Sequence, residues 1–193
     1  MGESAEPILC EVTRGPFAHP MMLKILRAYG RRAFARSSAC QGFIGFLDRI
    51  KAGEGGGVAL EIGTYHGITA LLLAERFDKV ISVSVDDEDP GRLLKRELAE
   101  FTGTKNIEFY DAKDNREKGE IVRALSFDFA YSDGDHMRDT IADWKLVNRC
   151  GRVLFHEVWP LQPAVWNLVN SLPPEEVTRC DDDILAYWES RRG

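Results

Sequence analysis

The feature that most constrains this sequence is an alternation of apolar runs and helical segments that starts at position 58. A strand is predicted at 58–62, and a turn with two glycines separates it from a helix at 69–76. The same alternation continues to the C-terminal part, with further strands at 79–85, 106–110, 127–132 and 152–156, weaker strands at 176–179 and 184–188, and helices at 91–102, 116–125, 138–148 and 161–172. This order predicts an α/β fold: a mainly parallel, seven-stranded sheet with helices on both faces.

The N-terminal part has a different pattern. Residues 1–15 are polar and irregular, and residues 17–50 carry apolar side chains at helical spacing, interrupted around 30–38. We therefore expect residues 1–50 to form an arm and two helices that cap the site, and residues 51–193 to form the main ligand-binding part of a single structural domain. A basic cluster in this region is either a solvated helix face or a contact for an anionic substrate or subunit: Arg27, Arg31, Arg32 and Arg36.

Charge and composition exclude several classes of partner. The formal net charge of −6 argues against a broad nucleic-acid interface. The four cysteines are isolated and form no zinc-finger spacing, which favours reduced thiols in a cytoplasmic protein. The N-terminus lacks the pattern of a signal peptide, and no apolar run approaches the roughly 18 to 20 residues that cross a bilayer. We expect no membrane partner.

The turn after the first strand is a candidate ligand site. A dinucleotide fingerprint would need glycines at positions 65 and 68, where the chain has Tyr65 and Ile68. The pattern present is E-x-G-x-x-x-G, from Glu61 to Gly67. A glycine here lets the backbone approach a ligand at the carboxyl end of the strand. The alternative is a tight strand-to-helix turn that binds nothing.

A second polar cluster follows the fourth and fifth predicted strands. Asp133, Asp135 and His136 come directly after one strand, and His156 and Glu157 end the next. Because parallel strands end at the same edge of a sheet, Asp133 and Glu157 could face a common point. Carboxylate oxygens there would suit a divalent cation such as Mg²⁺.

Three segments carry a family resemblance: LEIGTYHGITALLLAE, FDFAYSDGDHMRDTIADWKLV and CGRVLFHEVW. Their order and spacing resemble the class I S-adenosylmethionine (SAM) dependent methyltransferases, in particular methyltransferase family 24 and metal-dependent small-molecule O-methyltransferases such as catechol O-methyltransferase. The resemblance covers about residues 40 to 160. It implies a Rossmann-like class I methyltransferase fold and transfer of a methyl group from SAM to a hydroxyl of a small molecule.

The resemblance also implies roles for single residues in cofactor binding. Glu61 would accept a hydrogen bond from the cofactor's ammonium group. The acid that usually holds the ribose is replaced by Ser84, so that Asp86 becomes the substitute. Asp111 would bind the adenine amino group, unless it only forms a turn. The full predicted cofactor set is Glu61, Gly63, Thr64, Tyr65, His66, Gly67, Ser84, Asp86, Asp111 and Ala112.

For the chemical step, the resemblance makes Asp133 and His136 the predicted catalytic residues, with His136 as the base that takes the acceptor's proton. Alternatively, His136 only caps the helix that follows. Asp133, Glu157 and His156 are the predicted metal residues, although His156 is not the oxygen ligand that a full match would offer. The imperfect ribose and metal positions also fit a different hypothesis, a degenerate methyltransferase fold that binds SAM or acts as a scaffold subunit without transfer activity. A SAM-binding enzyme with other chemistry is a third reading. A homodimer is a further expectation.

Overall fold

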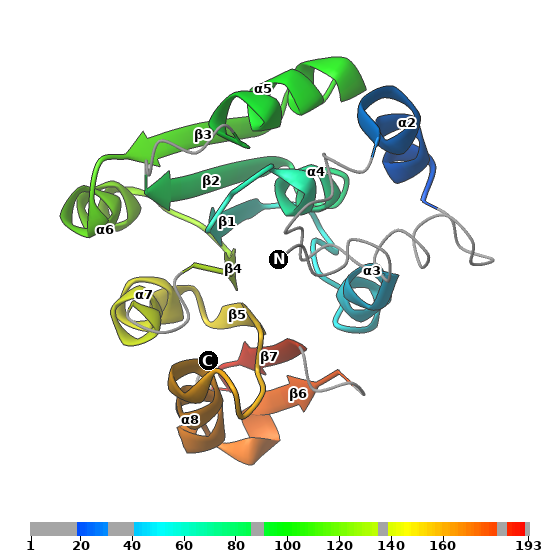
Figure 1. The fold of residues 1–193 in the computed structure, drawn as a ribbon. Coiled ribbons are helices and arrows are strands. Elements are labelled where there is room, and N and C mark those ends of the chain that lie inside the picture. Colours follow the sequence, from blue (N-terminus) through cyan, green and yellow to red (C-terminus); the bar gives the residue numbers. More distant parts are fainter. Residues whose placement is uncertain (1–18, 31–40, 86–90, 135–138, 181–184, 192–193) are drawn as a thin grey trace.

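The computed structural model describes residues 19–30, 41–85, 91–134, 139–180 and 185–191. Its centre is one seven-stranded sheet in the order β3-β2-β1-β4-β5-β7-β6 (Figure 1). β1 to β5 pair in parallel, and β7 is antiparallel to both of its neighbours. The strands are β1 (Val58–Ile62), β2 (Lys79–Val85), β3 (Ile107–Ala112), β4 (Phe129–Ser132), β5 (Arg152–His156), β6 (Val177–Arg179) and β7 (Leu185–Glu189). The predicted fold class is confirmed.

Helices cover both faces of the sheet, as Figure 1 shows. Alternate residues of each strand enter one of two apolar clusters, because successive side chains of a strand point to opposite faces. The first cluster joins Ala59 and Tyr131 to α2 (Pro20–Tyr29), α3 (Gln41–Arg49), α4 (Ile68–Ala74) and α5 (Gly91–Thr102). The second joins Leu60 and Phe155 to α6 (Asn115–Ala124), α7 (Thr140–Val147) and α8 (Pro163–Ser171). Two short 3-10 turns complete the described elements, η2 (Asn148–Cys150) and η3 (Pro174–Glu176).

The N-terminal helices belong to the first apolar cluster. Met22 and Ile25 of α2 are fully buried, as are Phe43 and Leu47 of α3. The ring of Phe43 meets Tyr131 of β4 edge to face, with ring centroids 5.2 Å apart. The two helices thus pack on the sheet beside α4 and α5. Their role as a cap over a ligand stays a prediction.

Two strand boundaries differ by two residues from those expected, and the other differences between predicted and observed strands are of one residue. β3 continues past 110 because its pairing with β2 continues, so that Asp111 lies inside the strand opposite Ser84. β4 begins only at Phe129, although the Asp128 N–H donates to the Val58 carbonyl and the Asp128 carboxylate accepts a hydrogen bond of 2.8 Å from the Val58 N–H. The first difference matters for the site, since it moves an acid from a loop to a sheet position.

The strand order reverses between β1 and β4, where such sheets bind ligands at the carboxyl ends of their strands. The turn after β1 and Asp133 after β4 both lie at this point. Among the described residues, no helix has the length and apolar content to cross a membrane.

Candidate active site

Two glycines shape the turn between β1 and α4. Gly63 has a φ of 93° and Gly67 a φ of 77°, a region that side chains rarely adopt. A Cβ on Gly63 would stand 2.0 Å from the carbonyl oxygen of Asp133, and one on Gly67 would stand 2.9 Å from the Cβ of Lys95. Both positions therefore need glycine for two independent reasons, backbone conformation and space. The turn is pressed against the end of β4 on one side and against α5 on the other.

Glu61 is the buried anchor of this turn. Its side chain is fully inaccessible, and its two carboxylate oxygens accept hydrogen bonds from the hydroxyls of Thr69 and Ser82. Thr64 continues the network, with its Oγ1 2.6 Å from the Ser82 Oγ. Burial raises the pKa of Glu61 to about 7, although the two hydroxyl groups oppose this shift. The carboxylate thus fixes β1, β2 and α4 to one another, and its contact with a cofactor's ammonium stays a prediction.

The aromatic residues of the turn lie together. Tyr65 has a φ of 43°, and its ring centroid lies 4.1 Å from that of His66. The His66 side chain is largely buried, and Thr64, which precedes Tyr65 in the sequence, is buried as well. These three residues form the wall of the turn between the two glycines.

Beside Ser84, which occupies the position expected for the ribose acid, the structure has a buried ion pair. The Lys95 side chain is 1% exposed, and its ammonium group donates to Asp111 Oδ1 and lies 3.1 Å from the Ser84 hydroxyl. Arg96 adds a second contact of 2.9 Å to Asp111 Oδ2. Burial alone would raise the pKa of Asp111, but hydrogen bonds from Lys95 and Arg96, together with their charges, outweigh it and lower the pKa.

Asp111 is therefore an ionised carboxylate that the protein itself neutralises. Its side chain is 6% exposed, and Ala112 beside it is fully buried. Recognition of adenine by Asp111 and Ala112 stays a prediction, as does the contribution of Ser84 to ribose binding. Asp86, the predicted substitute for the ribose acid, lies outside the described residues.

The ends of β4 and β5 bring Asp133 and His156 together. The two strands are in parallel register, with Ser132 opposite Phe155, so the next residue of each strand points to the same side. His156 Nδ1 lies 2.8 Å from Asp133 Oδ1. The hydroxyl of the buried Tyr131 donates to Asp133 Oδ2 at 3.1 Å. Tyr131, Asp133 and His156 thus form one hydrogen-bonded chain.

Glu157 takes a different direction. Its φ of 56° is unusual for a residue with a side chain, and its carboxylate accepts a hydrogen bond of 2.9 Å from Gln162. In the part of the chain that the structure describes, no group of three or more His, Cys, Asp or Glu side chains could hold a metal ion. Of the predicted metal residues, only Asp133 and His156 meet. Asp135 and His136 lie outside the described ranges.

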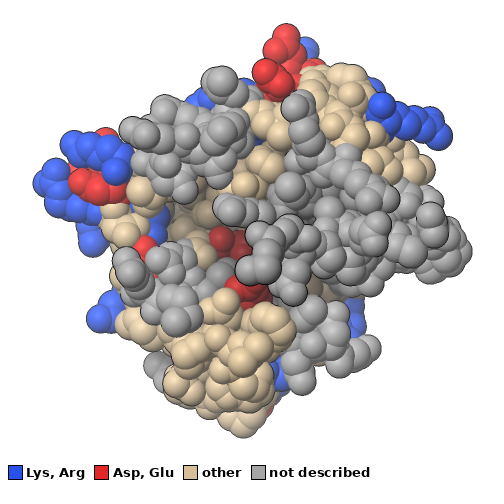
Figure 2. Space-filling view, viewed as in Figure 1, with Lys and Arg blue, Asp and Glu red and all other residues tan. Residues whose placement is uncertain are grey.

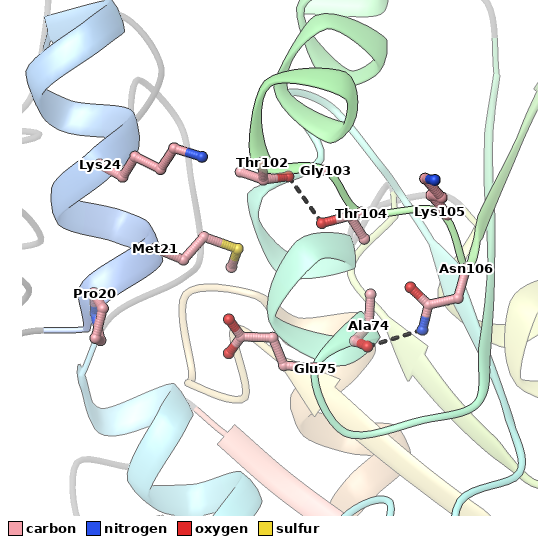
Figure 3. A pocket seen from close by; sticks show the side chains of 10 residues that line it. All are labelled: Pro20, Met21, Lys24, Ala74, Glu75, Thr102, Gly103, Thr104, Lys105 and Asn106. Carbon is pink, nitrogen blue, oxygen red and sulfur yellow. Dashed lines mark hydrogen bonds between the residues drawn. The ribbon is translucent and has the colours of Figure 1, made fainter.

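Acidic atoms gather in a hollow near the middle of one face, over the region where Figure 1 shows β4 and β5 (Figure 2). A separate pocket lies at the opposite edge of the sheet (Figure 3). It is lined by α2, the last turn of α4 and the loop from α5 to β3, where Asn106 donates to two backbone carbonyls at 2.9 Å. Because α4 begins at the glycine turn and ends here, this pocket is not the candidate site.

Several site residues had not been expected from the sequence. Lys95 could have been found from its helix, since it falls on the same face as the apolar Leu94 and Leu98. Ser82 could also have been found, because it is a polar residue that interrupts the β-branched pattern of β2. Tyr131 and Gln162 give no such signal, because a tyrosine in a strand and a glutamine in a loop are ordinary.

The sheet order and the glycine turn at its reversal point define the fold of the class I SAM-dependent methyltransferases. No family model matches the sequence, and no curated protein matches it. Solved structures do match over nearly the whole chain. A cofactor-bound protein from MTB has a TM-score of 0.71 at 16% identity and covers 94% of each chain.

Two further structures are similar. The O-methyltransferase from Bacillus cereus, in complex with SAH (S-adenosylhomocysteine), has a TM-score of 0.68 at 14% identity over 94% of this chain and 95% of that one. The O-methyltransferase TomG from Streptomyces achromogenes, in complex with SAM, has a TM-score of 0.60 at 14% identity over 89% and 90%. At these identities the comparisons establish the fold.

Proposed function

We propose that this chain is a SAM-dependent O-methyltransferase that methylates a hydroxyl of a small molecule. One observation carries the proposal: a sheet of the class I methyltransferase order has its glycine turn and its Asp133–His156 pair at the same reversal point. The similar folds of O-methyltransferases that bind SAH or SAM support this choice. The net charge of −6 fits a small-molecule acceptor better than a nucleic acid.

The cofactor would lie over the turn from Gly63 to Gly67. The absence of a Cβ at Gly63 brings the ends of β1 and β4 together, so the backbone itself forms the floor under the cofactor. Glu61, fixed by Thr69 and Ser82, keeps that floor rigid. The sulfonium of SAM makes its methyl group electrophilic, which leaves the protein to align donor and acceptor and to remove a proton.

A histidine would accept that proton. The sequence offers His136, shortly after Asp133, as the base implied by the family resemblance. An imidazole suits the task because its ordinary pKa near 6.5 lets it take up and release a proton at neutral pH.

A divalent cation, the other element implied by the resemblance, does not fit the described residues. Asp133 is engaged by Tyr131 and His156, and Glu157 is engaged by Gln162. A hard cation such as Mg²⁺ needs several oxygen ligands around one point. We therefore assign no step to a cation.

A transfer assay tests the proposal. Purified protein is incubated with SAM labelled in its methyl group and with a panel of catechols, phenols and sugar hydroxyls, and labelled product is separated. We expect transfer to at least one hydroxyl, and loss of transfer when Gly63 is replaced by Val. Binding of SAH without transfer to any acceptor would instead favour a SAM-binding subunit, and absence of both would reject the proposal.

A further inference from the structure

We infer that His156, oriented by Asp133, takes the proton of the acceptor hydroxyl, and that methyl transfer by this chain needs no divalent cation. The inference rests on the proposed function and assigns its proton acceptor to His156 instead of His136. It arises from a disagreement between the family resemblance, which implies a metal at these strand ends, and the contacts that the side chains make.

The first step is the orientation of the imidazole. His156 Nδ1 lies 2.8 Å from the carboxylate oxygen Oδ1 of Asp133. A carboxylate accepts hydrogen bonds, so this contact favours the tautomer that carries its hydrogen on Nδ1. In that tautomer Nε2 is the atom that exchanges a proton with a bound hydroxyl. The same logic applies wherever a carboxylate orients a histidine base.

The second step is that Asp133 is fixed in this role. Its other oxygen, Oδ2, accepts a hydrogen bond of 3.1 Å from Tyr131, a residue that is fully buried. Both oxygens of Asp133 thus have partners within the protein. A cation that took the place of either partner would remove a hydrogen bond from Asp133, and a buried tyrosine hydroxyl left without its acceptor costs about 1–3 kcal/mol.

The third step is location. The backbone of Asp133 touches the glycine turn, since a Cβ on Gly63 would stand 2.0 Å from the Asp133 carbonyl oxygen. His156 ends the neighbouring strand and is 12% exposed, so it is sheltered but lies at the ligand edge of the sheet. A hydroxyl bound beside the cofactor's methyl group would therefore be next to His156.

The reaction balances with these groups alone. The acceptor oxygen attacks the methyl carbon, an oxygen–carbon bond forms, and the sulfur–carbon bond breaks with its electron pair passing to sulfur, which gives SAH. The hydroxyl proton passes to His156 Nε2 and is later released to water. The Asp133 carboxylate stabilises the imidazolium formed in between.

The hydrogen-bonded pair of Asp133 and His156 is tested without any methyl acceptor. Nitrogen NMR of ¹⁵N-histidine-labelled protein should find the neutral His156 ring with its hydrogen on Nδ1, and Asp133→Asn should change that signal. Calorimetric titration with Mg²⁺ or Mn²⁺, with SAH present, should give the same result for wild type and Asp133→Asn. A stoichiometric cation site that Asp133→Asn removes would overturn the inference.

The catalytic half uses the transfer assay. Chelator-treated wild type should keep its turnover, and His156→Gln should lower kcat about a hundredfold or more while SAH affinity stays within about twofold. His19→Gln is the matched control, because His19 pairs with Glu75 at the far pocket and should leave turnover unchanged. Loss of turnover on chelation with recovery on adding a cation would overturn the inference. Unchanged turnover in His156→Gln, with the loss confined to His136→Gln, would do the same.

The two proposals fail in different ways. If wild type binds no SAH and methylates no acceptor, the proposed function is wrong, and the NMR and cation titrations still decide between a hydrogen-bonded pair and a metal site. If transfer occurs but depends on a cation, only the inference about His156 is wrong.

Discussion

Gly63 lies so close to Asp133 that a Cβ at position 63 would stand 2.0 Å from the Asp133 carbonyl oxygen. This contact joins the glycine turn after β1 to the polar chain after β4. Because Asp133 also contacts His156 at the end of β5, the proposed donor site and the proposed proton acceptor lie at the ends of the two strands that flank β4.

Replacement of Gly63 by Ala should destabilise the fold more than the same change at Gly55. The two glycines have nearly equal φ values, 93° and 90°, but a Cβ on Gly55 would meet nothing within 4 Å. Each alanine costs about 1–2 kcal/mol for its backbone conformation. Gly63→Ala should cost a further 1–3 kcal/mol, roughly, because the end of β4 must move. Urea unfolding measures both; equal losses would show that the contact is not tight.

Glu61 should give the chain a pH-dependent stability. Burial raises its pKa from 4.5 to about 7 in the folded state. At a pH below 4.5, the pKa of Glu61 in the unfolded chain, Glu61 is protonated in both the folded and the unfolded state. As the pH rises towards 7, the unfolded chain loses its proton first, so the folded state binds more protons and the free energy of unfolding falls, by up to about 3 kcal/mol. Above the folded pKa of about 7, Glu61 is ionised in both states and causes no further change in the free energy of unfolding.

Glu61→Gln should remove most of this fall, which unfolding curves at pH 5, 6, 7 and 8 would measure. Glu108→Gln is the control, because Glu108 is half exposed and its pKa is lowered by its hydrogen bond with Lys79. That variant should follow the wild-type pH profile. A wild-type free energy that does not change between pH 5 and pH 8 would contradict the assigned pKa.

The two cations beside Asp111 should differ in their contributions. Lys95 is buried, whereas the Arg96 side chain is 53% exposed. Lys95→Met leaves a buried carboxylate without its main partner and should cost about 3–5 kcal/mol. Arg96→Met should cost about 1 kcal/mol or less.

A double variant separates loss of the charge partner from loss of packing. Lys95→Met combined with Asp111→Asn removes both members of the pair and should be more stable than Lys95→Met alone. Thermal unfolding of the four proteins gives the comparison. Similar losses in Lys95→Met and Arg96→Met would mean that burial does not govern this ion pair.

Tyr131→Phe should weaken the orientation of Asp133 without changing the glycine turn after β1. Loss of the hydrogen bond to Asp133 Oδ2 should cost about 1 kcal/mol of stability and lower turnover about fivefold, with SAH affinity unchanged. Tyr187→Phe, on the same sheet face but on β7, is the control and should keep wild-type turnover. Equal turnover in both variants would show that Tyr131 has no part in the reaction.

The sheet was predictable from the sequence because its strands are buried on both faces and read as short apolar runs between helical segments. The polar residues at the ends of β1 and β4 were predictable as well, because these two strands could be located in the sequence. The residues that they contact in space were not predictable. The pairing of Asp133 with His156 depends on the register of β4 and β5, and that of Asp111 with Lys95 on a strand that runs two residues further than expected.

The metal prediction shows the same limit. Spacing along the chain placed Glu157 beside His156 at the end of β5. The backbone at Glu157 adopts a φ of 56°, which brings its side chain to Gln162 rather than to Asp133. The backbone angle at Glu157 thus decides whether its carboxylate lies near Asp133. No residue pattern in this segment specifies that angle.

Calorimetric titration of the wild-type chain with SAH is the most direct test of a cofactor site at the glycine turn after β1. We expect a single saturable site with micromolar affinity, and a large loss of affinity in Gly63→Ala measured at a temperature where that variant remains folded. A dissociation constant of about 1 mM corresponds to a binding free energy of only about −4 kcal/mol. If SAH at concentrations up to about 1 mM releases no heat and causes no thermal shift, the turn is not a cofactor site.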